Sequence, residues 1–135
     1  MRYILWENGL IGLDGTAYTS QTALRTKDYF TSEDFPFAKV EKDGVLFAVA
    51  KYDTEKNFIE RSTMNLTEYF FESGFYYKIT FVEKVDGVDI AQTVNDFYKI
   101  GLYSYKDYAL ENAVNNIVAG NYTDGNAADL WENGS

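Results

Sequence analysis

Apolar and more polar side chains alternate along residues 75–82. Phe75, Tyr77, Ile79 and Phe81 occupy every second position of this segment. A period of two is typical of a strand with one buried face. The pattern therefore predicts a strand here, with these four side chains directed into the core.

Residues 45–50 are apolar without interruption. Such a run is typical of a strand that is covered on both faces, so we expect it at the centre of a sheet. Asp-Gly pairs at residues 43–44 and 86–87 favour tight turns and predict antiparallel hairpins. Four further segments are predicted as strands: Tyr3–Trp6, Phe37–Glu41, Phe58–Ser62 and Val88–Asn95.

Start and stop signals predict a helix from Ser104 to Gly120. Asp107 follows Ser104 by three residues, and a glycine can end the helix in a left-handed conformation. Five apolar side chains between these ends fall on one helical face: Leu110, Ala113, Val114, Ile117 and Val118.

Two shorter helices are predicted earlier in the chain. Asn65 and Glu68 have the spacing of a capping box, and Gly74 can end the helix that follows. The segment Ser20–Phe30 is a weaker helix candidate, because its apolar spacing is less regular and it contains threonines.

Together these elements predict the α+β fold class. We expect an antiparallel sheet of about five to seven strands, with two or three helices packed on one face. Residues 1–120 are predicted to form a single domain, and residues 121–135 an acidic C-terminal tail.

A self-comparison of the sequence finds two repeats. Val40–Val45 recurs as Val82–Val88 with one inserted residue, Val85. If this repeat reflects duplication, the fold contains two pseudo-symmetric helix-hairpin units of about 40 residues. The alternative is that Asp-Gly turns with flanking charges are common hairpin chemistry.

The second repeat is letter for letter: Leu5–Gly9 and Leu130–Gly134 are both Leu-Trp-Glu-Asn-Gly. One interpretation is a second strand-to-turn element that docks near the first, with a neighbouring subunit as one possible location. Chance is the other interpretation.

Composition indicates a folded domain without common catalytic groups. The chain has 135 residues, of which 46% are hydrophobic and 18% aromatic. It contains no histidine and no cysteine, which removes the commonest general base and metal ligand, thiol nucleophiles and disulfides. No phosphate-binding glycine loop is present, and residues 124–135 lack the ligand pattern of a calcium loop. We therefore predict a protein that is not an enzyme and has no metal or cofactor.

The N-terminal residues and the absence of long apolar runs predict a cytoplasmic protein that does not insert into membranes. Glu7 and the turn residues Asn8 and Gly9 interrupt the first apolar residues before a signal-peptide core could form.

The formal charge of −9 disfavours direct binding to nucleic acid or anionic lipid and favours a basic protein partner. Residues 86–135 hold 8 acidic and 2 basic residues, and no basic residue follows Lys106. Because Asp107 and Glu111 are four residues apart, the predicted helix places both on one face. The predicted partner-binding residues combine acidic and aromatic side chains: Asp107, Glu111, Tyr122, Asp124, Asp129, Trp131 and Glu132.

In size, charge and aromatic content the chain is similar to the small acidic proteins with which phages and mobile elements block host defence systems. That general likeness implies a non-enzymatic, anti-CRISPR-like inhibitor that binds a basic protein, such as a nuclease, in the cytoplasm of the host cell. A toxin immunity protein is a related alternative.

Other classes of function remain open from the sequence. One is a protein that binds or sequesters a nucleotide-like signal, with tyrosine and phenylalanine rings stacking on the ligand and Lys39, Lys78 or Arg61 contacting its phosphates. Others are a small enzyme that uses lysine, tyrosine or carboxylates, and a homo-oligomeric virion component.

Overall fold

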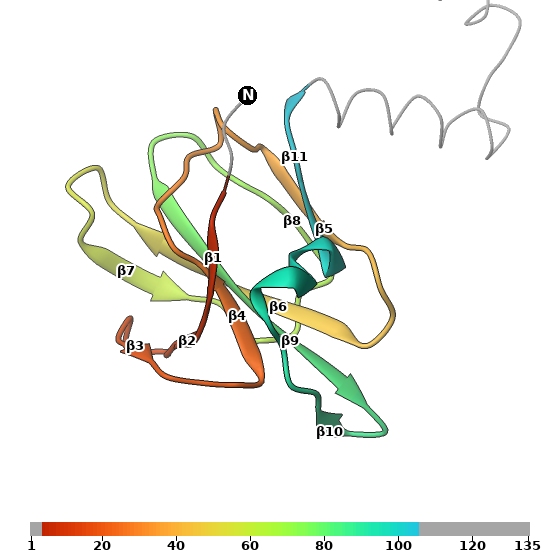
Figure 1. Cartoon of the computed structure of the whole chain (residues 1–135). Helices are drawn as coiled ribbons and strands as arrows, with labels where there is room; N and C mark the ends of the chain where they lie inside the picture. The colour runs from red at the N-terminus through yellow and green to blue at the C-terminus, as the bar shows by residue number, and fades with distance from the viewer. Residues whose placement is uncertain (1–3, 106–135) are drawn as a thin grey trace, which may run out of the picture. The chain divides into compact units, whose positions relative to one another are not determined.

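The computed structural model describes residues 4–105 and is dominated by antiparallel β-structure (Figure 1). Its largest sheet has six strands in the order β1-β4-β9-β6-β7, with β10 paired to the end of β9. These strands are β1 (Trp6–Asn8), β4 (Ala23–Thr26), β6 (Val45–Tyr52), β7 (Phe58–Arg61), β9 (Tyr76–Val85) and β10 (Val88–Asp89).

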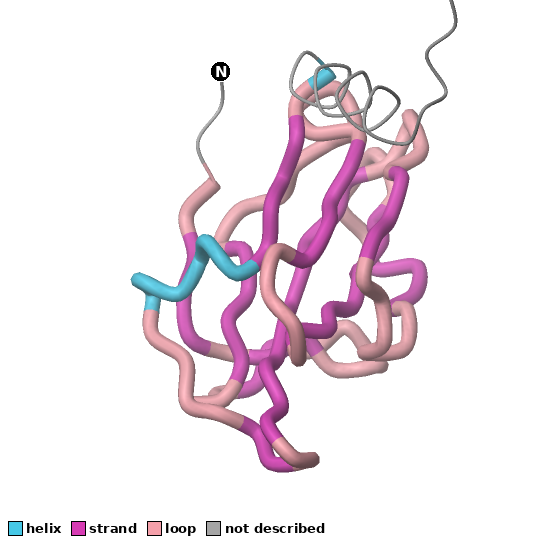
Figure 2. Tube along the Cα trace, turned by 90° about the vertical axis from the view of Figure 1, so that its right-hand side faces the viewer, coloured by secondary structure: helices cyan, strands magenta, loops and turns pink. Residues whose placement is uncertain are grey.

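A second sheet has the strand order β11-β5-β8, and β2 and β3 form a separate short hairpin. A 3-10 helix, η1, directly precedes β11; in Figure 2 it is the longer of the two cyan segments, at the left of the magenta strands. The bounds of these elements are β2 (Leu10–Ile11), β3 (Ala17–Tyr18), β5 (Phe37–Val40), β8 (Glu68–Phe70), η1 (Val94–Lys99) and β11 (Ile100–Tyr103).

The main core is shared by the two larger sheets. Side chains of β4, β6 and β9 pack in one buried cluster with side chains of β5 and β11 and of the connecting segments. The alternation predicted for residues 75–82 is confirmed, because Tyr77, Ile79 and Phe81 are fully buried and Phe75 packs against them.

The central position predicted for Val45–Ala50 is also confirmed. β6 pairs with β9 along its whole length and with β7 on its other edge. Strand predictions for residues 37–41 and 58–62 agree with β5 and β7, whereas the first strand lies later in the chain than expected, at Trp6–Asn8.

The predicted α+β fold class is wrong. Among residues 4–105 the structure is mostly antiparallel strand, and its helical element is the short 3-10 helix η1. Within the described residues, no α-helices pack on a face of the sheet, and the predicted pair of helix-hairpin units is not found. The predicted helix Ser104–Gly120 lies almost entirely outside the described residues.

The segment predicted as helix Ser20–Phe30 contains strand β4 instead. Leu24 is buried against the core, and the Thr26 hydroxyl accepts a hydrogen bond of 3.0 Å from the backbone N–H of Ile79 on β9. Threonines suit a strand better than a helix, and pairing with both β1 and β9 outweighs the local helical spacing.

The segment 65–74, also predicted as a helix, contains strand β8. Leu66 forms an isolated bridge with Phe47, and the aromatic residues that follow pair with β5 or enter the core. Gly74 does adopt a left-handed φ of 89°, but in the turn that leads into β9. The prediction of a left-handed backbone at Gly74 is therefore correct, but the prediction that Gly74 ends a helix is wrong.

Only the beginning of the predicted strand Val88–Asn95 is a strand. β10 covers Val88–Asp89, and a capping box formed by Thr93 and Asp96 starts η1 a few residues later. Asp86-Gly87 closes the predicted hairpin between β9 and β10. Asp43-Gly44 does not close one, because β5 and β6 belong to different sheets.

The predicted domain 1–120 and tail 121–135 extend past the described residues, so that boundary stays a prediction. No helix within residues 4–105 has the length and apolar character needed to cross a membrane.

Candidate functional site

The seven residues predicted to bind a partner all lie outside the described part of the chain, so their arrangement stays a prediction. They are Asp107, Glu111, Tyr122, Asp124, Asp129, Trp131 and Glu132.

Alternation along the six-stranded sheet places a second set of side chains on the face opposite the core. On β9, Tyr76 and Lys78 alternate with core residues, and on β6, Ala50 and Tyr52 have the opposite parity to the core residues Val45, Phe47 and Val49. This face carries a smaller buried cluster built around Ile11, Ala50 and Tyr52.

Register across β9, β6 and β7 arranges this face in two neighbouring rows. In one row, Tyr76 lies opposite Tyr52, which lies opposite Phe58. In the other row, Lys78 and Arg61 flank Ala50. An aromatic row therefore runs beside a row that contains two cations.

Tyr29 and Lys56 complete a group that we call the ring–cation site, defined as Tyr29, Lys56, Tyr76 and Lys78. The rings of Tyr29 and Tyr76 have centroids 5.9 Å apart. The Lys78 Nζ atom lies 4.4 Å from the Tyr29 centroid, and the Lys56 Nζ atom lies 5.1 Å from it. Lys56 also lies 5.2 Å from the Tyr76 centroid, so Lys56 is within cation–π range of both rings and Lys78 is within that range of Tyr29.

Lys56 is held in place by an unusual backbone conformation. Its φ of 68° is left-handed, which is sterically costly for a residue with a Cβ atom. The Asp53 carboxylate fixes this turn by accepting hydrogen bonds of 2.8 Å from the N–H of Glu55 and 2.9 Å from the N–H of Asn57. A lysine at a position that suits glycine or asparagine points to a role for its side chain.

The cations of this face differ in how their charge is balanced. Arg25 forms an ion pair of 2.6 Å with Glu7. Among the described residues, Lys56, Arg61 and Lys78 form no ion pair with a carboxylate. Burial, followed by the charge of Arg25, lowers the pKa of the Lys78 ammonium, and burial lowers the pKa of Arg61. Burial therefore disfavours the charged form of both side chains, and the charges of Glu7 and Asp28 partly offset this effect at Lys78.

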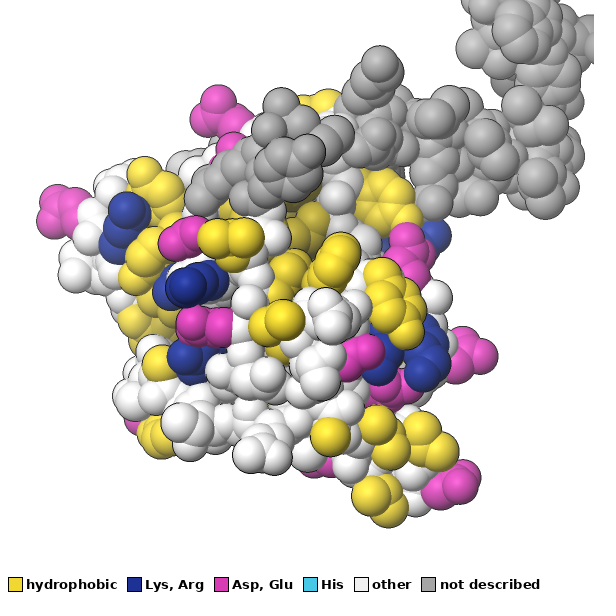
Figure 3. All heavy atoms as spheres, viewed as in Figure 1, with side chains coloured by type: hydrophobic (Ala, Val, Ile, Leu, Met, Phe, Trp, Pro, Cys, Tyr) yellow, Lys and Arg dark blue, Asp and Glu magenta, His cyan; other side chains and the backbone are white. Residues whose placement is uncertain are grey.

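The outer surface reflects this arrangement. In Figure 3, which has the orientation of Figure 1, basic side chains in blue lie beside both hydrophobic side chains in yellow and acidic side chains in magenta in the region between β1 and β7. This part of the surface therefore carries cations next to apolar side chains and carboxylates.

No protein-family model matches the chain, and no curated protein or solved structure matches it either.

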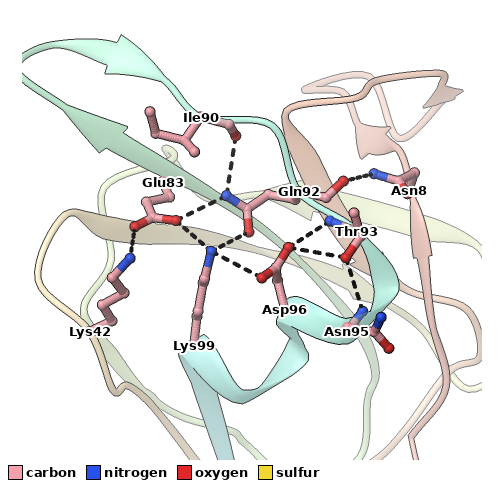
Figure 4. Close-up of polar contacts among 9 residues, drawn as sticks. All are labelled: Asn8, Lys42, Glu83, Ile90, Gln92, Thr93, Asn95, Asp96 and Lys99. Atoms are coloured by element: carbon pink, nitrogen blue, oxygen red, sulfur yellow. Dashed lines mark hydrogen bonds and ion pairs between the residues drawn. The ribbon is translucent and has the colours of Figure 1, made fainter.

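A second concentration of charge lies at the other end of β9, where Glu83 is buried (Figure 4). Lys99, from η1, donates hydrogen bonds of 2.6 Å to Glu83 and 3.1 Å to Gln92. Gln92 also donates to Glu83 at 3.1 Å, and Lys42 forms an ion pair with the second oxygen of Glu83. These contacts join β9, η1 and the segment before β6.

The balance of contacts keeps Glu83 ionised. Burial alone would raise the pKa of its carboxyl group, but hydrogen bonds from Lys42, Lys99 and Gln92 outweigh burial and lower the pKa to about 2. Burial alone would lower the pKa of the Lys99 ammonium, but hydrogen bonding and ion pairing with Glu83 and Asp96 outweigh burial and raise it.

This network has the properties of a structural element. Among the described residues, no buried side-chain nitrogen or oxygen lacks a hydrogen-bond partner. Glu83 and Lys99 are therefore fully engaged with each other and their neighbours, and neither has a pKa suited to proton transfer near neutrality. The described residues also contain no group of three or more side chains of the kinds that hold a metal ion.

Sequence reasoning found part of the ring–cation site. Lys78 and Arg61 were expected to contact a ligand, and they lie on the same sheet face, whereas Lys39 is on β5 of the other sheet. The sequence places Tyr29 in the predicted helix Ser20–Phe30 and gives no signal for Lys56. The left-handed φ of Lys56 leaves no mark in the sequence, because a lysine gives no turn signal of the kind that Gly or Asn would give.

Proposed function

We propose that this protein binds or sequesters a nucleotide or nucleotide-derived signal at the ring–cation site, without catalysing a reaction. The observation that carries this proposal is the position of two lysines, Lys56 and Lys78, over Tyr29 without a carboxylate partner among the described residues.

The chemistry of the four side chains suits a ligand with a flat ring and a negative charge. A nucleobase can stack on a tyrosine ring, an interaction worth about 1–3 kcal/mol per base in proteins that bind single-stranded nucleic acid. The ammonium groups, on flexible stems, can turn from the rings to the phosphate and form charge-assisted hydrogen bonds. Lys56 is exposed and has room to make this movement.

The net charge of the protein limits the size of the ligand. A long nucleic acid would experience the overall charge of −9, whereas a mononucleotide reaches only the local cations. The site therefore favours a small ligand with few phosphates over a polymer.

A thermal-shift and calorimetric titration with AMP, GMP, CMP and UMP would test this proposal. We expect at least one nucleotide to raise the melting temperature saturably, since binding to the native state stabilises it. Adenosine and inorganic phosphate, titrated separately, should bind more weakly than AMP, because each supplies only the ring or only the charge. No shift with any mononucleotide, or tighter binding of oligothymidylate than of mononucleotides, would contradict the proposal.

Matched variants separate the ring and the charge contributions. Tyr29→Phe keeps the ring and should bind, whereas Tyr29→Leu should lose binding by about tenfold or more. Lys56→Gln removes one charge at the site. Its control is Lys84→Gln, which removes one charge from the exposed ion pair with Asp89 on the β9–β10 hairpin. Equal affinities of these two lysine variants would argue against a role for Lys56.

The inhibitor function expected from the acidic C-terminal residues stays a second proposal. It is supported by the sequence alone, in which no basic residue follows Lys106. Pull-down of the tagged protein from bacterial lysate at two salt concentrations tests it. We expect a basic partner that is lost at high salt, and that is not retained after reversing Asp107, Glu111, Asp129 and Glu132 to lysine. Unchanged retention by that variant would rule out this surface.

A further inference from the structure

Lys78 is a half-buried lysine without a carboxylate partner. It lies on β9 between the buried residues Tyr77 and Ile79. Its cross-strand neighbour on β6 is Ala50, whose methyl group can neither accept a hydrogen bond nor balance a charge. Among residues 4–105, no carboxylate forms an ion pair with Lys78. The ammonium form of this side chain is therefore partly desolvated without an ion pair to compensate.

Two other lysines show what is particular to Lys78. The Lys51 Nζ atom also lies over a ring, 3.9 Å from the Phe75 centroid, but it forms an ion pair of 3.0 Å with Glu72. The hydrogen bond to Glu72 outweighs burial and raises the pKa of the Lys51 ammonium. Lys27 forms no ion pair within the described residues either, but it is exposed to water. Of these three lysines, only Lys78 combines partial burial with the lack of a carboxylate partner.

The surroundings of Lys78 favour its neutral amine more than water does. Burial, and then the positive charge of Arg25, lower the pKa of the Lys78 ammonium, and the charges of Glu7 and Asp28 only partly offset this effect. A neutral amine has a lone pair and is a nucleophile, whereas an ammonium group is not. Lysines activated by desolvation or by a neighbouring cation are the ones that form imines with carbonyl compounds.

The neighbouring side chains define the compound that this amine would meet. The Lys78 Nζ atom lies 4.4 Å from the centroid of Tyr29, a ring on which another flat ring can pack. The Nζ atom of the exposed residue Lys56 lies 5.1 Å from the same centroid and can pair with an acidic group. These contacts favour a flat ring that carries a negative charge.

We propose that Lys78 is a covalent attachment site for a small aromatic aldehyde that carries an acidic group. The Lys78 amine forms the covalent bond, Tyr29 contacts the ring, and Lys56 pairs with the acidic group. Nucleotide binding is not required for this reaction, because a mononucleotide has no free aldehyde. The aldehyde experiment below and the nucleotide titration can therefore fail independently.

The reaction needs no group beyond the amine and the aldehyde. The nitrogen lone pair attacks the carbonyl carbon, the π electrons of the C=O bond move to oxygen, and one proton passes from nitrogen to that oxygen. The resulting carbinolamine loses its hydroxyl group as water, together with the second proton of the amine, and a C=N bond is formed. One water molecule leaves for each imine, no atom is oxidised or reduced, and hydrolysis reverses the reaction.

Borohydride trapping on the full-length protein tests this attachment. The protein is incubated with substoichiometric pyridoxal phosphate, an aromatic aldehyde with a phosphate group. Sodium borohydride then adds hydride to the imine carbon and gives a stable secondary amine, and peptide mass spectrometry measures the adduct on each lysine. We expect Lys78 to carry several-fold more adduct than Lys51, the control for a paired lysine over a ring, or Lys27, the control for an exposed lysine.

Variants separate the amine from the charge. Lys78→Arg keeps a positive charge but cannot form an imine, so it should lose the main adduct while its circular dichroism and melting temperature stay close to those of the unsubstituted protein. Lys56→Gln should reduce trapping of pyridoxal phosphate at Lys78 and leave trapping of pyridoxal, which lacks the phosphate, unchanged. Lys84→Gln, from the exposed ion pair with Asp89, is the charge-matched control and should leave both unchanged.

Three results would count against this site. An even distribution of adduct over Lys27, Lys51 and Lys78 would overturn the proposal, because it would show that Lys78 has no special reactivity. A main adduct on Lys56 or on the N-terminal amine would overturn it as well. Equal trapping of pyridoxal and pyridoxal phosphate at Lys78 of the unsubstituted protein would overturn the requirement for an acidic group.

Discussion

The ammonium of Lys99 lies 2.6 Å from the carboxylate of Glu83, and both side chains are almost completely buried. Taking two charges out of water is costly, and the cost is offset here by further hydrogen bonds from Lys42 and Gln92. The pair fixes η1 to β9 and so determines where the chain begins β11.

Neutralising Glu83 should therefore strongly destabilise the protein. We expect Glu83→Gln to lower the free energy of unfolding by about 3 kcal/mol, because it leaves the buried Lys99 ammonium with only the partly exposed Asp96 carboxylate, 3.3 Å away, as a charged partner. Asp89→Asn is the control: it breaks the exposed Lys84–Asp89 pair and should cost less than about 1 kcal/mol. Chemical denaturation of both variants gives the comparison, and equal losses would contradict the structural role of Glu83.

Acid should destabilise the fold through the same carboxylate. The folded-state pKa of Glu83, about 2, is below its ordinary value of 4.5, so the unfolded state binds a proton more readily. The stabilisation from Glu83 is fully present above pH 4.5 and is lost as the pH falls from 4.5 towards 2. Denaturation curves between pH 7 and pH 2 should show this loss, and the slope should be smaller in Glu83→Gln. An equal slope in the variant would assign the acid sensitivity to other carboxylates.

The two Asp-Gly turns should respond differently to alanine. Gly44 and Gly87 both have a left-handed φ, of 88° and 79°. A Cβ atom on Gly44 would lie 2.6 Å from the backbone carbonyl oxygen of Lys84, whereas one on Gly87 has no atom within 4 Å. We expect Gly87→Ala to cost about 1 kcal/mol, the backbone penalty alone, and Gly44→Ala to cost clearly more. Thermal unfolding of both variants measures the difference.

Lys56 should be more important for binding than for stability. Asparagine tolerates the left-handed backbone, so Lys56→Asn relieves strain while it removes the cation–π contacts with Tyr29 and Tyr76. These two changes oppose each other, and we expect the free energy of unfolding to stay within about 1 kcal/mol of the unsubstituted protein. Nucleotide affinity should fall in the same variant. A large loss of stability with unchanged affinity would assign Lys56 a structural role.

Local patterns in the sequence determined which segments become the buried strands. The alternation from Phe75 to Phe81 and the apolar run Val45–Ala50 correspond to the parts of β9 and β6 that fill the core. Such patterns succeed because strand periodicity requires only that alternate side chains be apolar, whichever strand lies next to them.

The aromatic and threonine-containing segments near Leu24 and Tyr69 could not be assigned in this way. Their spacing also fits a short helix, and only pairing with distant strands, β9 for β4 and β5 for β8, decides in favour of a strand. The stabilisation from those long-range pairings cannot be read from neighbouring residues. The capping signals of Asn65 and Gly74 therefore predicted a helix where the chain forms strand β8.

The repeated Val-Glu-Lys motif illustrates the same limit at the level of single residues. Both copies contain an Asp-Gly turn, but only the second copy closes a hairpin, and the first instead brings Lys42 to Glu83 of the second. Likewise, the sequence shows that Lys78 and Arg61 are cations. Their positions on one sheet face follow from the register of β9, β6 and β7, and the contact of Lys78 with Tyr29 follows from the tertiary structure. The sequence by itself determined side-chain chemistry and the alternation of buried positions. Only the tertiary structure decided which of these side chains meet, because strand register is set by contacts between residues that are distant along the chain.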